Sequence, residues 1–597
     1  MSALPSIQID GIEYQLEGES GPFRACLQAE DLEPGLHLIH MILESEEAAT
    51  PSPFKLTWSQ PIVDTQYEWT PACGPKRWLE VPWEQPLRSK ATEQAPVICQ
   101  YNLAQINRIT FACSDVLNPI EMASRIREHN ATFVACVDFF VQPVAPLREY
   151  RATLRVDRRA IPYHEALDQV QAWWAALPGI TPAPVPDLGR MPMYSTWYSF
   201  HQDLKAAAVE HQCELAKGYG CEAVIIDDGW QTEDNSGGYA HCGDWEVAPS
   251  KIPDMRAHVA RIHTLGMKCL LWFSVPFIGE YDRAFQRFEG KYLCKVAWCK
   301  AHVLDPRFPE VREYLIALYE KAVREWDFDG LKLDFVDSFT PTAENYKERN
   351  PAHDIDSVPV AVDRLLRDTM VRLRAIKPDI LIEFRQSYVG PLMRHYGNLF
   401  RAADCPNDAV TNRTRTLDIR LISGNTATHS DMLMWSRDEP VESAALQLLN
   451  ILYSVPQISV KLDEIPGDHQ RMLRFWLQFW REHREVLLDG KLEPQHPELL
   501  YPFVLAKTDS LWIGAFYSDV VAPLSGKLPD EFWLINATSQ PRVVIECDTT
   551  PGTYETQIYN VLGEPQNCAI VSFPPGVSTF AVPPSGLIHF KHHTQRA

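Results

Sequence analysis

A regular alternation of short apolar strands and amphipathic helices in the middle of the chain constrains its fold most. Strand-like segments such as CEAVIIDDGW (221–230), MKCLLWFSV (267–275) and GLKLDFV (330–336) are each followed by a helical segment. Roughly eight such strand–helix units fit between residues 181 and 492. Units of this kind build parallel sheets, and about eight of them close into a barrel. The sequence therefore predicts a central (β/α)8 TIM barrel.

The segments on either side of the barrel have a different pattern. Residues 1–180 contain short alternating segments separated by turn residues, and a proline-rich stretch at 177–192 marks a boundary. The alternation returns in residues 493–597. We expect a multidomain α/β and β protein, in which an N-terminal β-sandwich and a small C-terminal β-sandwich flank the barrel.

Charge and composition exclude several classes of partner. The formal charge of −22 disfavours a nucleic-acid partner or an anionic membrane surface. We find no apolar run near the roughly 20 residues that span a bilayer, and no secretory signal at the start of the sequence. The fourteen cysteines are scattered without metal-ligand spacing. These features favour a cytoplasmic protein with free thiols and no bound metal.

Polar side chains collect where the predicted barrel strands end. Active sites of such barrels lie at the carboxyl ends of the strands. One aspartate there is ordinarily a helix cap or half of an ion pair, but carboxylates at the ends of several strands favour a functional site. The polar and aromatic residues at these ends are Trp197, Asp227, Asp228, Trp272, Lys332, Asp334, Asp337, Glu383, Arg385, Arg401, Asp404, His429 and Asp431.

The segment GLKLDF suggests a division of labour between two carboxylates. Lys332 and Asp334 are two residues apart on a strand and therefore share a face. The lysine favours the ionised aspartate, which suits a nucleophile. A second carboxylate on the sixth strand, across the pocket, could stay protonated and act as an acid. Glycoside cleavage uses two carboxylates in these two roles.

Several motifs in a fixed order carry a family resemblance. STW, VIIDDGWQ, GDWEVAPSKIP, GLKLDF and RAADCPNDA resemble the bacterial melibiase-type α-galactosidases and the raffinose-synthase-like relatives of glycoside-hydrolase clan D. The resemblance spans about residues 190–465. It implies the same barrel between two β domains, and dimers or tetramers as a possible homo-oligomeric state.

The resemblance also implies roles for individual residues. Asp334 falls on the family's nucleophile and Asp404 on its general acid/base. Asp227, Asp228 and Lys332 fall on residues that bind sugar hydroxyls. The remaining candidates for sugar contact are Trp197 and Trp272 as pocket walls, Asp244 and Trp245 at the mouth, and Arg385, Gln386, Arg401 and Asp408.

The chain departs from the family after the fifth strand. Family members close to the well-known galactosidases carry a Cys-Ser-Gly-Gly-Gly-like run there, whereas this chain has IEFRQSYVGP (382–391). Arg385 is a permanent cation with a rigid fork of donors. It either supports the mouth through an ion pair, with Glu383 or Asp404, or contacts a substituent of the substrate. A further local variation is Cys405-Pro406 after the acid/base.

We predict a retaining exo-α-glycosidase, most simply an α-galactosidase, that acts on a small carbohydrate and needs no metal or organic cofactor. An α-glucosidase or isomaltosidase, an α-N-acetylgalactosaminidase and an α-glycosyl transferase remain alternatives on the same scaffold. A non-catalytic sugar-binding protein is a further alternative, because a fold does not by itself fix a function.

Overall fold

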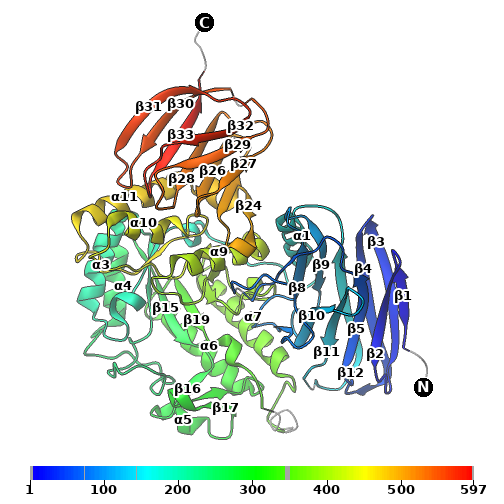
Figure 1. The fold of residues 1–597 in the computed structure, drawn as a ribbon. Coiled ribbons are helices and arrows are strands. Elements are labelled where there is room, and N and C mark those ends of the chain that lie inside the picture. Colours follow the sequence, from blue (N-terminus) through cyan, green and yellow to red (C-terminus); the bar gives the residue numbers. More distant parts are fainter. Residues whose placement is uncertain (1–3, 73, 143, 343–349, 551, 594–597) are drawn as a thin grey trace.

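The chain folds into a barrel between two β regions (Figure 1). The computed structural model describes residues 4–72, 74–142, 144–342, 350–550 and 552–593. The N-terminal β region lies to one side of the barrel, and the C-terminal one lies over the helices α10 and α11 (Figure 1). The predicted barrel and its two β flanks are confirmed.

Two antiparallel sheets make the N-terminal region, with the orders β1-β2-β5-β11-β10-β7 and β3-β4-β12-β9-β8-β6. Side chains on β2 alternate between buried and exposed, so one face of its sheet contributes Tyr14 and Leu16 to the core between the sheets. The strands are β1 (Ser6–Ile9), β2 (Ile12–Gly18), β3 (Arg24–Glu33), β4 (Leu36–Ala49), β5 (Phe54–Pro61), β6 (Tyr67–Trp69), β7 (Leu87–Ser89), β8 (Val97–Tyr101), β9 (Asn107–Cys113), β10 (Ile120–Arg127), β11 (Thr132–Phe139) and β12 (Leu147–Asp157).

A helix follows β12. The sequence analysis did not predict it, because it assigned all of residues 1–180 to the sandwich. Helix α1 (Tyr163–Ala175) buries Leu167, Val170 and Trp174 on one side. The Trp174 indole donates a hydrogen bond to the carbonyl of Cys113 on β9, at 2.9 Å. This helix ties the sandwich to the barrel, because it also packs against α9.

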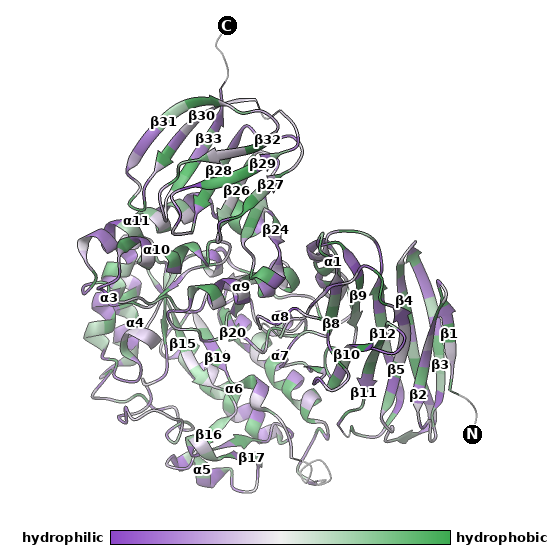
Figure 2. Ribbon diagram, in the orientation of Figure 1, coloured by the Kyte–Doolittle hydropathy of each residue, from purple (hydrophilic) through white to green (hydrophobic). Residues whose placement is uncertain are grey.

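The barrel sheet is parallel and nearly closed, with the order β22-β21-β20-β19-β15-β14-β13-β23. A bridge between His429 and Val455 joins its two ends. Its strands are apolar in Figure 2, as expected for a sheet covered by helices. They are β13 (Met193–Ser195), β14 (Ala223–Ile226), β15 (Lys268–Ser274), β19 (Gly330–Asp334), β20 (Leu381–Arg385), β21 (Leu399–Arg401), β22 (Ala427–His429) and β23 (Gln457–Ile458).

The helices around the barrel begin with familiar signals. The Ser357 side chain accepts a hydrogen bond from the Val360 amide at the start of α7, which also has a proline in its first turn. Its buried stripe includes Leu365, Leu366 and Leu373. The helices of this region are α2 (Trp197–Phe200), α3 (Ala206–Tyr219), α4 (Met255–Thr264), α6 (Pro309–Arg324), α7 (Val358–Ile376), α8 (Met393–Tyr396), α9 (Ala409–Ser423), α10 (Val441–Leu449), α11 (Gly467–Glu482) and α12 (Arg484–Asp489).

A small insertion that was not predicted follows β15. It contains an antiparallel sheet with the order β16-β18-β17. Because the insertion begins at the carboxyl end of β15, it lies beside the mouth of the barrel, at the bottom of Figure 1. Its elements are β16 (Phe277–Gly279), α5 (Arg283–Arg287), β17 (Tyr292–Val296), the 3₁₀ helix η2 (Ala297–Cys299) and β18 (Ala301–Leu304).

The C-terminal region pairs a seven-stranded sheet with a three-stranded one. Its first strand begins at Lys491, just before the boundary expected at 493. The strands are β24 (Lys491–Gln495), β25 (Phe503–Lys507), β26 (Leu511–Phe516), β27 (Val521–Leu524), β28 (Glu531–Asn536), β29 (Val543–Cys547), β30 (Thr553–Tyr559), β31 (Pro565–Ser572), β32 (Gly576–Phe580) and β33 (Leu587–His592).

One buried carboxylate joins all three regions. Asp418 of α9 is fully buried and accepts hydrogen bonds from Arg77 (2.6 and 2.8 Å) and Trp69 (2.9 Å) of the N-terminal region. The Tyr501 hydroxyl, from the C-terminal region, donates to it at 2.5 Å. This single side chain of the barrel therefore contacts both of the neighbouring regions.

Candidate active site

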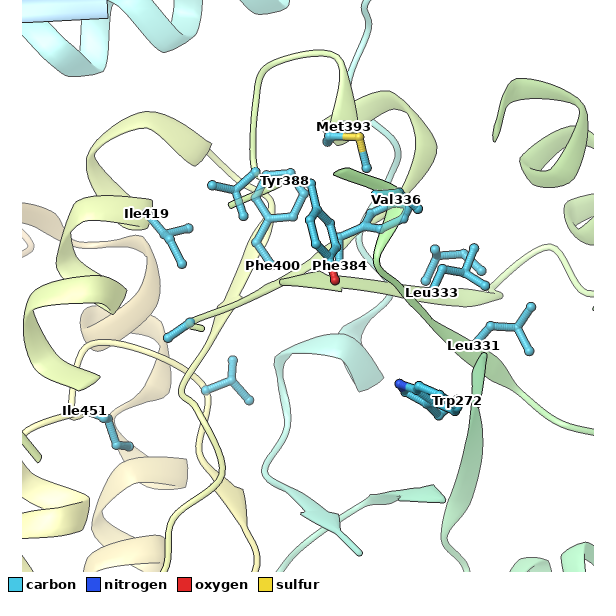
Figure 3. Close-up of a cluster of buried hydrophobic side chains, with 14 of the residues drawn as sticks. Trp272, Leu331, Leu333, Val336, Phe384, Tyr388, Met393, Phe400, Ile419 and Ile451 are labelled. Atoms are coloured by element: carbon cyan, nitrogen blue, oxygen red, sulfur yellow. The ribbon is translucent and has the colours of Figure 1, made fainter. Parts of the chain in front are cut away.

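Asp334, the last residue of β19, is enclosed by hydrogen-bond donors and is only 6% exposed. The Trp272 indole donates to Oδ2 at 3.0 Å. Arg385 forms an ion pair with Oδ1 at 2.7 Å, and the Phe335 amide donates to Oδ1 at 2.9 Å. The Tyr388 hydroxyl also donates to Oδ1. Figure 3 shows Trp272 and Tyr388 among the buried side chains that surround Leu331 and Leu333 of β19.

These neighbours keep Asp334 ionised. Burial alone would raise the pKa of its carboxyl. The charges of Arg385 and then Lys332, with the hydrogen bonds from Tyr388 and Trp272, outweigh burial and hold the pKa well below its ordinary value. A buried carboxylate that stays negative across the physiological range can act as a nucleophile.

Lys332 has a different direct partner from the one its spacing suggests. Its ammonium is 2.6 Å from Oδ2 of Asp227, and both side chains are buried. Its charge still lowers the pKa of Asp334, but less than the charge of Arg385 does. Lys332 therefore links the end of β14 to the end of β19, and it supports ionisation of Asp334 from a distance.

Asp228 has a separate set of contacts. The amide of Gln202 donates to Oδ2 at 2.8 Å, and the amide of Gln231 donates to Oδ1 at 2.6 Å. Burial raises the pKa of Asp228 to about 6, and the negative charge of Asp227 adds to the rise while the two amide hydrogen bonds oppose it. The two neighbouring aspartates are thus held by different donors, a lysine for one and two amides for the other.

Arg401 organises the carboxylates at the end of β21. It is 1% exposed and pairs with Asp404 at 2.9 Å and with Asp431 at 2.5 Å. Glu383 lies 3.6 Å from its Nε. The Tyr198 hydroxyl donates to the second oxygen of Asp431 at 2.9 Å. Arg401 therefore positions Asp404 and also neutralises charge deeper in the barrel.

Asp404 is the one carboxylate of this group with a large exposed surface, since 49% of its side chain is accessible. Desolvation would raise its pKa, but the charges of Arg401, Lys332 and Arg385 lower it, and the net pKa lies below the ordinary value. The expectation that a carboxylate on the sixth strand stays protonated is therefore wrong for the free protein. The negative charge of Asp334 acts in the opposite direction on Asp404, so the two carboxylates share one electrostatic environment.

Arg385 pairs with Asp334 rather than with Glu383 or Asp404, the two protein partners expected from the sequence. Its guanidinium also lies over the rings of Phe335 (5.1 Å) and Tyr388 (5.5 Å). The run that replaces the glycine-rich segment of the family thus supplies a cation and a hydroxyl to the candidate nucleophile.

The other candidates at strands β13, β20 and β21 have mixed outcomes. Trp197 opens α2, is half-buried and packs against the His201 ring at 4.6 Å. The side-chain oxygen of Gln386 accepts a hydrogen bond from the Ala403 amide at 3.1 Å, which joins the ends of β20 and β21. Asp408 caps helix α9, and both of its carboxylate oxygens accept hydrogen bonds from Thr411. The contacts of Asp408 are those of a helix cap and do not join it to Asp404.

The two side chains of the GDW motif lie in different places: Asp244 is beside the mouth of the barrel, and Trp245 is buried behind Trp272. Asp244 pairs with Arg283 at 2.9 Å and lines a cavity of about 570 Å³. Trp245 is 3% exposed, and its ring packs against Trp272 and Phe273. Trp245 supports Trp272 from behind, which differs from the direct position at the mouth that the sequence suggested.

Several residues of the cluster were not singled out as sugar-site candidates: Tyr388, Asp431, Tyr198, Gln202 and Tyr239. The sequence predicts only that Asp431 lies at the end of a barrel strand. Tyr388 lies within IEFRQSYVGP, and its position three residues after Arg385 was the only available signal. Tyrosines and glutamines are common in loops, so sequence alone did not distinguish them.

Within the described residues, no group of three or more His, Cys, Asp or Glu side chains is arranged to hold a metal ion. None of the described helices combines the length and the apolar character needed to cross a membrane.

The fold and the cluster define a class: a barrel protein with β-sandwich flanks and with carboxylates at the carboxyl ends of its strands. Residues 187–387 match the model of the Melibiase family. The resemblance inferred from the motifs is thereby confirmed over this part of the barrel.

Curated relatives match a limited part of the chain. An α-galactosidase of Lactobacillus acidophilus is 29% identical over 205 residues, which is 32% of this chain and 26% of the relative. The A type blood α-D-galactosamine galactosaminidase of Flavonifractor plautii is 28% identical over 153 residues, which is 22% of this chain and 13% of that protein. The chain thus matches about a quarter or less of the length of these two relatives.

Solved structures match over most of the chain. The family 36 α-galactosidase AgaA of Geobacillus stearothermophilus, in complex with raffinose, gives a TM-score of 0.66 at 13% identity and covers 99% of this chain and 85% of that one. The α-galactosidase of Thermus thermophilus, in complex with p-nitrophenyl α-D-galactopyranoside, gives 0.55 at 15% identity over 83% and 97% of the two chains. At these identities the matches establish the fold.

Proposed function

We propose that the protein is a retaining exo-α-glycosidase that releases terminal α-galactose from oligosaccharides or glycosides. The observation that carries the proposal is Asp334, a buried carboxylate held ionised by Arg385, Tyr388 and Trp272 at the carboxyl end of a barrel strand. A second carboxylate, Asp404, lies in the same electrostatic environment and is open to solvent. The α-galactosidases among the relatives support the choice of sugar.

The hydrogen bonds of Asp334 favour one oxygen for attack. Within the described part of the chain, Oδ1 accepts three hydrogen bonds and Oδ2 accepts one, from Trp272. Oδ2 therefore keeps more free lone-pair density for the anomeric carbon. In the first step Oδ2 bonds to that carbon, the glycosidic C–O bond breaks, and Asp404 gives its proton to the departing oxygen. A β-linked glycosyl-enzyme results.

In the second step Asp404 takes a proton from water, and the water oxygen displaces Asp334 to release the α-sugar. Asp404 must therefore carry a proton when the substrate is bound, although Arg401 favours its ionised form in the free protein. A bound sugar that covers the exposed half of Asp404 would desolvate it and raise its pKa. We propose that substrate binding raises the pKa of Asp404 in this way, so that Asp404 carries the proton that it donates.

Lys332, Asp227 and Asp228 are proposed to hold hydroxyls of the terminal sugar. Asp227 and Asp228 are each 2% exposed and directly follow β14, and Lys332 lies on β19, with β15 between these two strands. Their fixed donors, Lys332 for one and Gln202 with Gln231 for the other, leave carboxylate lone pairs for sugar hydroxyls. These fixed carboxylates would distinguish sugars by the positions of their hydroxyls, because each remaining lone pair accepts a hydrogen bond from one direction.

A panel of aryl α-glycosides that differ only in the sugar tests the proposal. We expect α-galactoside to be cleaved fastest, and NMR of the first product should show the α-anomer. Release of the β-anomer would contradict the retaining mechanism. No cleavage of any α-glycoside in the panel would contradict the enzymatic role.

An α-N-acetylgalactosaminidase is the second candidate function. The galactosaminidase of Flavonifractor plautii supports it through its 28% identical segment. The same panel separates the two candidates, since an aryl α-N-acetylgalactosaminide must fit an acetamido group where the galactoside has a hydroxyl. Preference for that substrate over the galactoside would replace the first proposal with this one.

We further propose a cytoplasmic location and a homo-oligomeric state. The cysteines in the described residues are free thiols, most of them buried, which suits a reducing compartment. Cell fractionation tests the location, and light scattering of the purified protein tests the oligomeric state. Recovery from the cell exterior, or a monomeric mass, would contradict the respective proposal.

A further inference from the structure

A file of aromatic rings leads away from the candidate nucleophile. Tyr239, on the loop that follows β14, stacks on Trp272 with 5.9 Å between ring centroids. It also contacts the edge of Phe335 at 5.0 Å. Trp272 and Phe335 both donate hydrogen bonds to Asp334. The Tyr239 ring therefore contacts two residues that hold the nucleophile, Trp272 through its indole and Phe335 through its backbone amide.

The outer end of this file is open to solvent. Trp298, in η2 of the insertion, contacts the Tyr239 ring at 5.8 Å and is 71% exposed. An indole buries a large apolar area when it is covered, so a tryptophan left this open retains a large unused contact surface. Tyr239 itself is half-buried, and its hydroxyl makes no hydrogen bond to any residue that the structure describes.

The loop and the insertion that carry these rings are packed as one unit. The Tyr239 amide donates to the carbonyl of Cys299 at 3.3 Å, and the Gly279 amide donates to the carbonyl of Cys242 at 2.6 Å. A side chain at Gly279 would collide with the carbonyl of Ala240, so only glycine allows this approach. The backbone segments that carry Tyr239 and Trp298 are thus held together before any ligand binds, which reduces the entropy cost of binding.

We propose that Tyr239 and Trp298 form the binding surface for the leaving-group side of the substrate, which is an oligosaccharide of at least three sugar units. The inference rests on the proposed function. The terminal sugar occupies the end of the barrel beside Asp334 and Trp272. The second unit lies against Tyr239, and the third stacks its apolar C–H face on the Trp298 indole. The free hydroxyl of Tyr239 supplies a hydrogen bond to the second unit.

Trp298→Ala, compared with the wild type on two substrates, tests the proposal. We expect kcat/KM for an α-galactosyl trisaccharide such as raffinose to fall roughly tenfold more than kcat/KM for an aryl α-galactoside, because only the trisaccharide reaches the indole. Trp298→Phe, which keeps an aromatic face, should recover most of the difference. Trp83→Ala is the matched control, because Trp83 is 72% exposed but lies in the N-terminal region. It should leave both rates unchanged.

Binding separates a failure of this inference from a failure of the proposed function. Calorimetry of raffinose with Asp334→Asn protein, with and without Trp298→Ala, measures the contact without turnover. A dissociation constant for raffinose that is roughly tenfold larger in the double variant than in Asp334→Asn protein supports the inference. Equal affinities, or equal losses on both substrates in the kinetic comparison, overturn it. A wild-type protein that binds raffinose through Trp298 but cleaves no α-glycoside would overturn the proposed function alone.

Discussion

Asp334 and Arg385 occupy equivalent positions on neighbouring strands. The parallel register pairs Gly330 with Leu381 and Lys332 with Glu383, and continuing it by two residues brings Asp334 beside Arg385. Since residues two apart share a face, both side chains project from the same side of the sheet. Their ion pair is therefore a direct result of the register between β19 and β20.

Replacement of the nucleophile should remove turnover. Asp334→Asn keeps the shape of the side chain but loses the negative charge that attacks the anomeric carbon. We expect kcat on the best aryl α-glycoside to fall by roughly a thousandfold or more. Asp254→Asn is the control, because Asp254 caps α4 through the Ala257 amide and asparagine also caps helices. A rate near wild type in Asp334→Asn would exclude this residue as the nucleophile.

The acid limb of the pH profile should report on the donors around Asp334. Its pKa is held below the ordinary value, so the reactive carboxylate is lost only when the pH falls through that low value. Tyr388→Phe removes one donor and raises this pKa, so the acid limb of kcat/KM should move to higher pH. Arg385→Met should move it further, because the charge of Arg385 lowers the pKa more than the Tyr388 hydrogen bond does.

Arg385→Lys provides a check on that assignment, because it keeps the charge but loses the planar fork. Its acid limb should lie between those of the wild type and Arg385→Met. Identical acid limbs in all variants would show that Asp334 does not set this part of the profile.

The residue-scale comparison separates what spacing can predict from what it cannot. The separation of Lys332 and Asp334 by two residues was enough to place both at the mouth. It did not reveal that Lys332 pairs with Asp227 or that Arg385 pairs with Asp334, because both pairs depend on the register between strands that are distant in sequence. The charge state of Asp404 was misjudged because the charges of Arg401, Lys332 and Arg385 together outweigh desolvation, and spacing along the sequence does not show how close these three cations lie.

At the scale of elements, β21 and the segment after it concentrate buried charge. Arg401 faces Asp404, Asp431 and Glu383, and of these only Asp404 is open to solvent. Three carboxylates around one guanidinium are compatible with folding only while the cation is present, because an unpaired buried charge is costly.

Arg401→Met should therefore destabilise the protein strongly. It leaves Asp431 and Glu383 buried without their cation, and we expect a loss of roughly 3–5 kcal/mol in the free energy of unfolding. Denaturant unfolding followed by fluorescence measures the loss. Arg364→Met is the control, because the Arg364 side chain is 62% exposed in an ion pair with Asp368 and should matter by less than about 0.5 kcal/mol. Similar stabilities in the two variants would contradict the assigned role of Arg401.

The elements that sequence patterns missed are short or interrupted. The strands of the insertion, β16, β17 and β18, have between three and five residues. Alternation over so few positions cannot be distinguished from a loop. Helix α1 has a clear buried stripe, but it follows directly on the last strand of the sandwich and was absorbed into that domain.

At the scale of the whole molecule, the order of domains followed from periodicity, whereas their contacts did not. The change from alternating segments to strand–helix units and back again is visible in the sequence. The junction at Asp418 depends on side chains more than 300 residues apart, such as Arg77, and no local pattern connects them. A prediction from sequence therefore gave three separate domains, and the structure gives one connected assembly.

Removal of the junction carboxylate should weaken this connection. Asp418→Ala leaves Arg77 buried without its anionic partner, which we expect to cost roughly 3–5 kcal/mol. Scanning calorimetry should show a single transition in the wild type and a lower, split transition in the variant, because the regions then unfold less cooperatively. An unchanged single transition would contradict a coupling role for Asp418.

The position of Asp418 also sets a delay during synthesis. Arg77 and Asp418 are 341 residues apart, so at ordinary rates of translation the aspartate is made roughly 20 to 70 s after the arginine. During that interval the emerging N-terminal sandwich presents a cation and the Trp69 indole at a surface that has no partner yet.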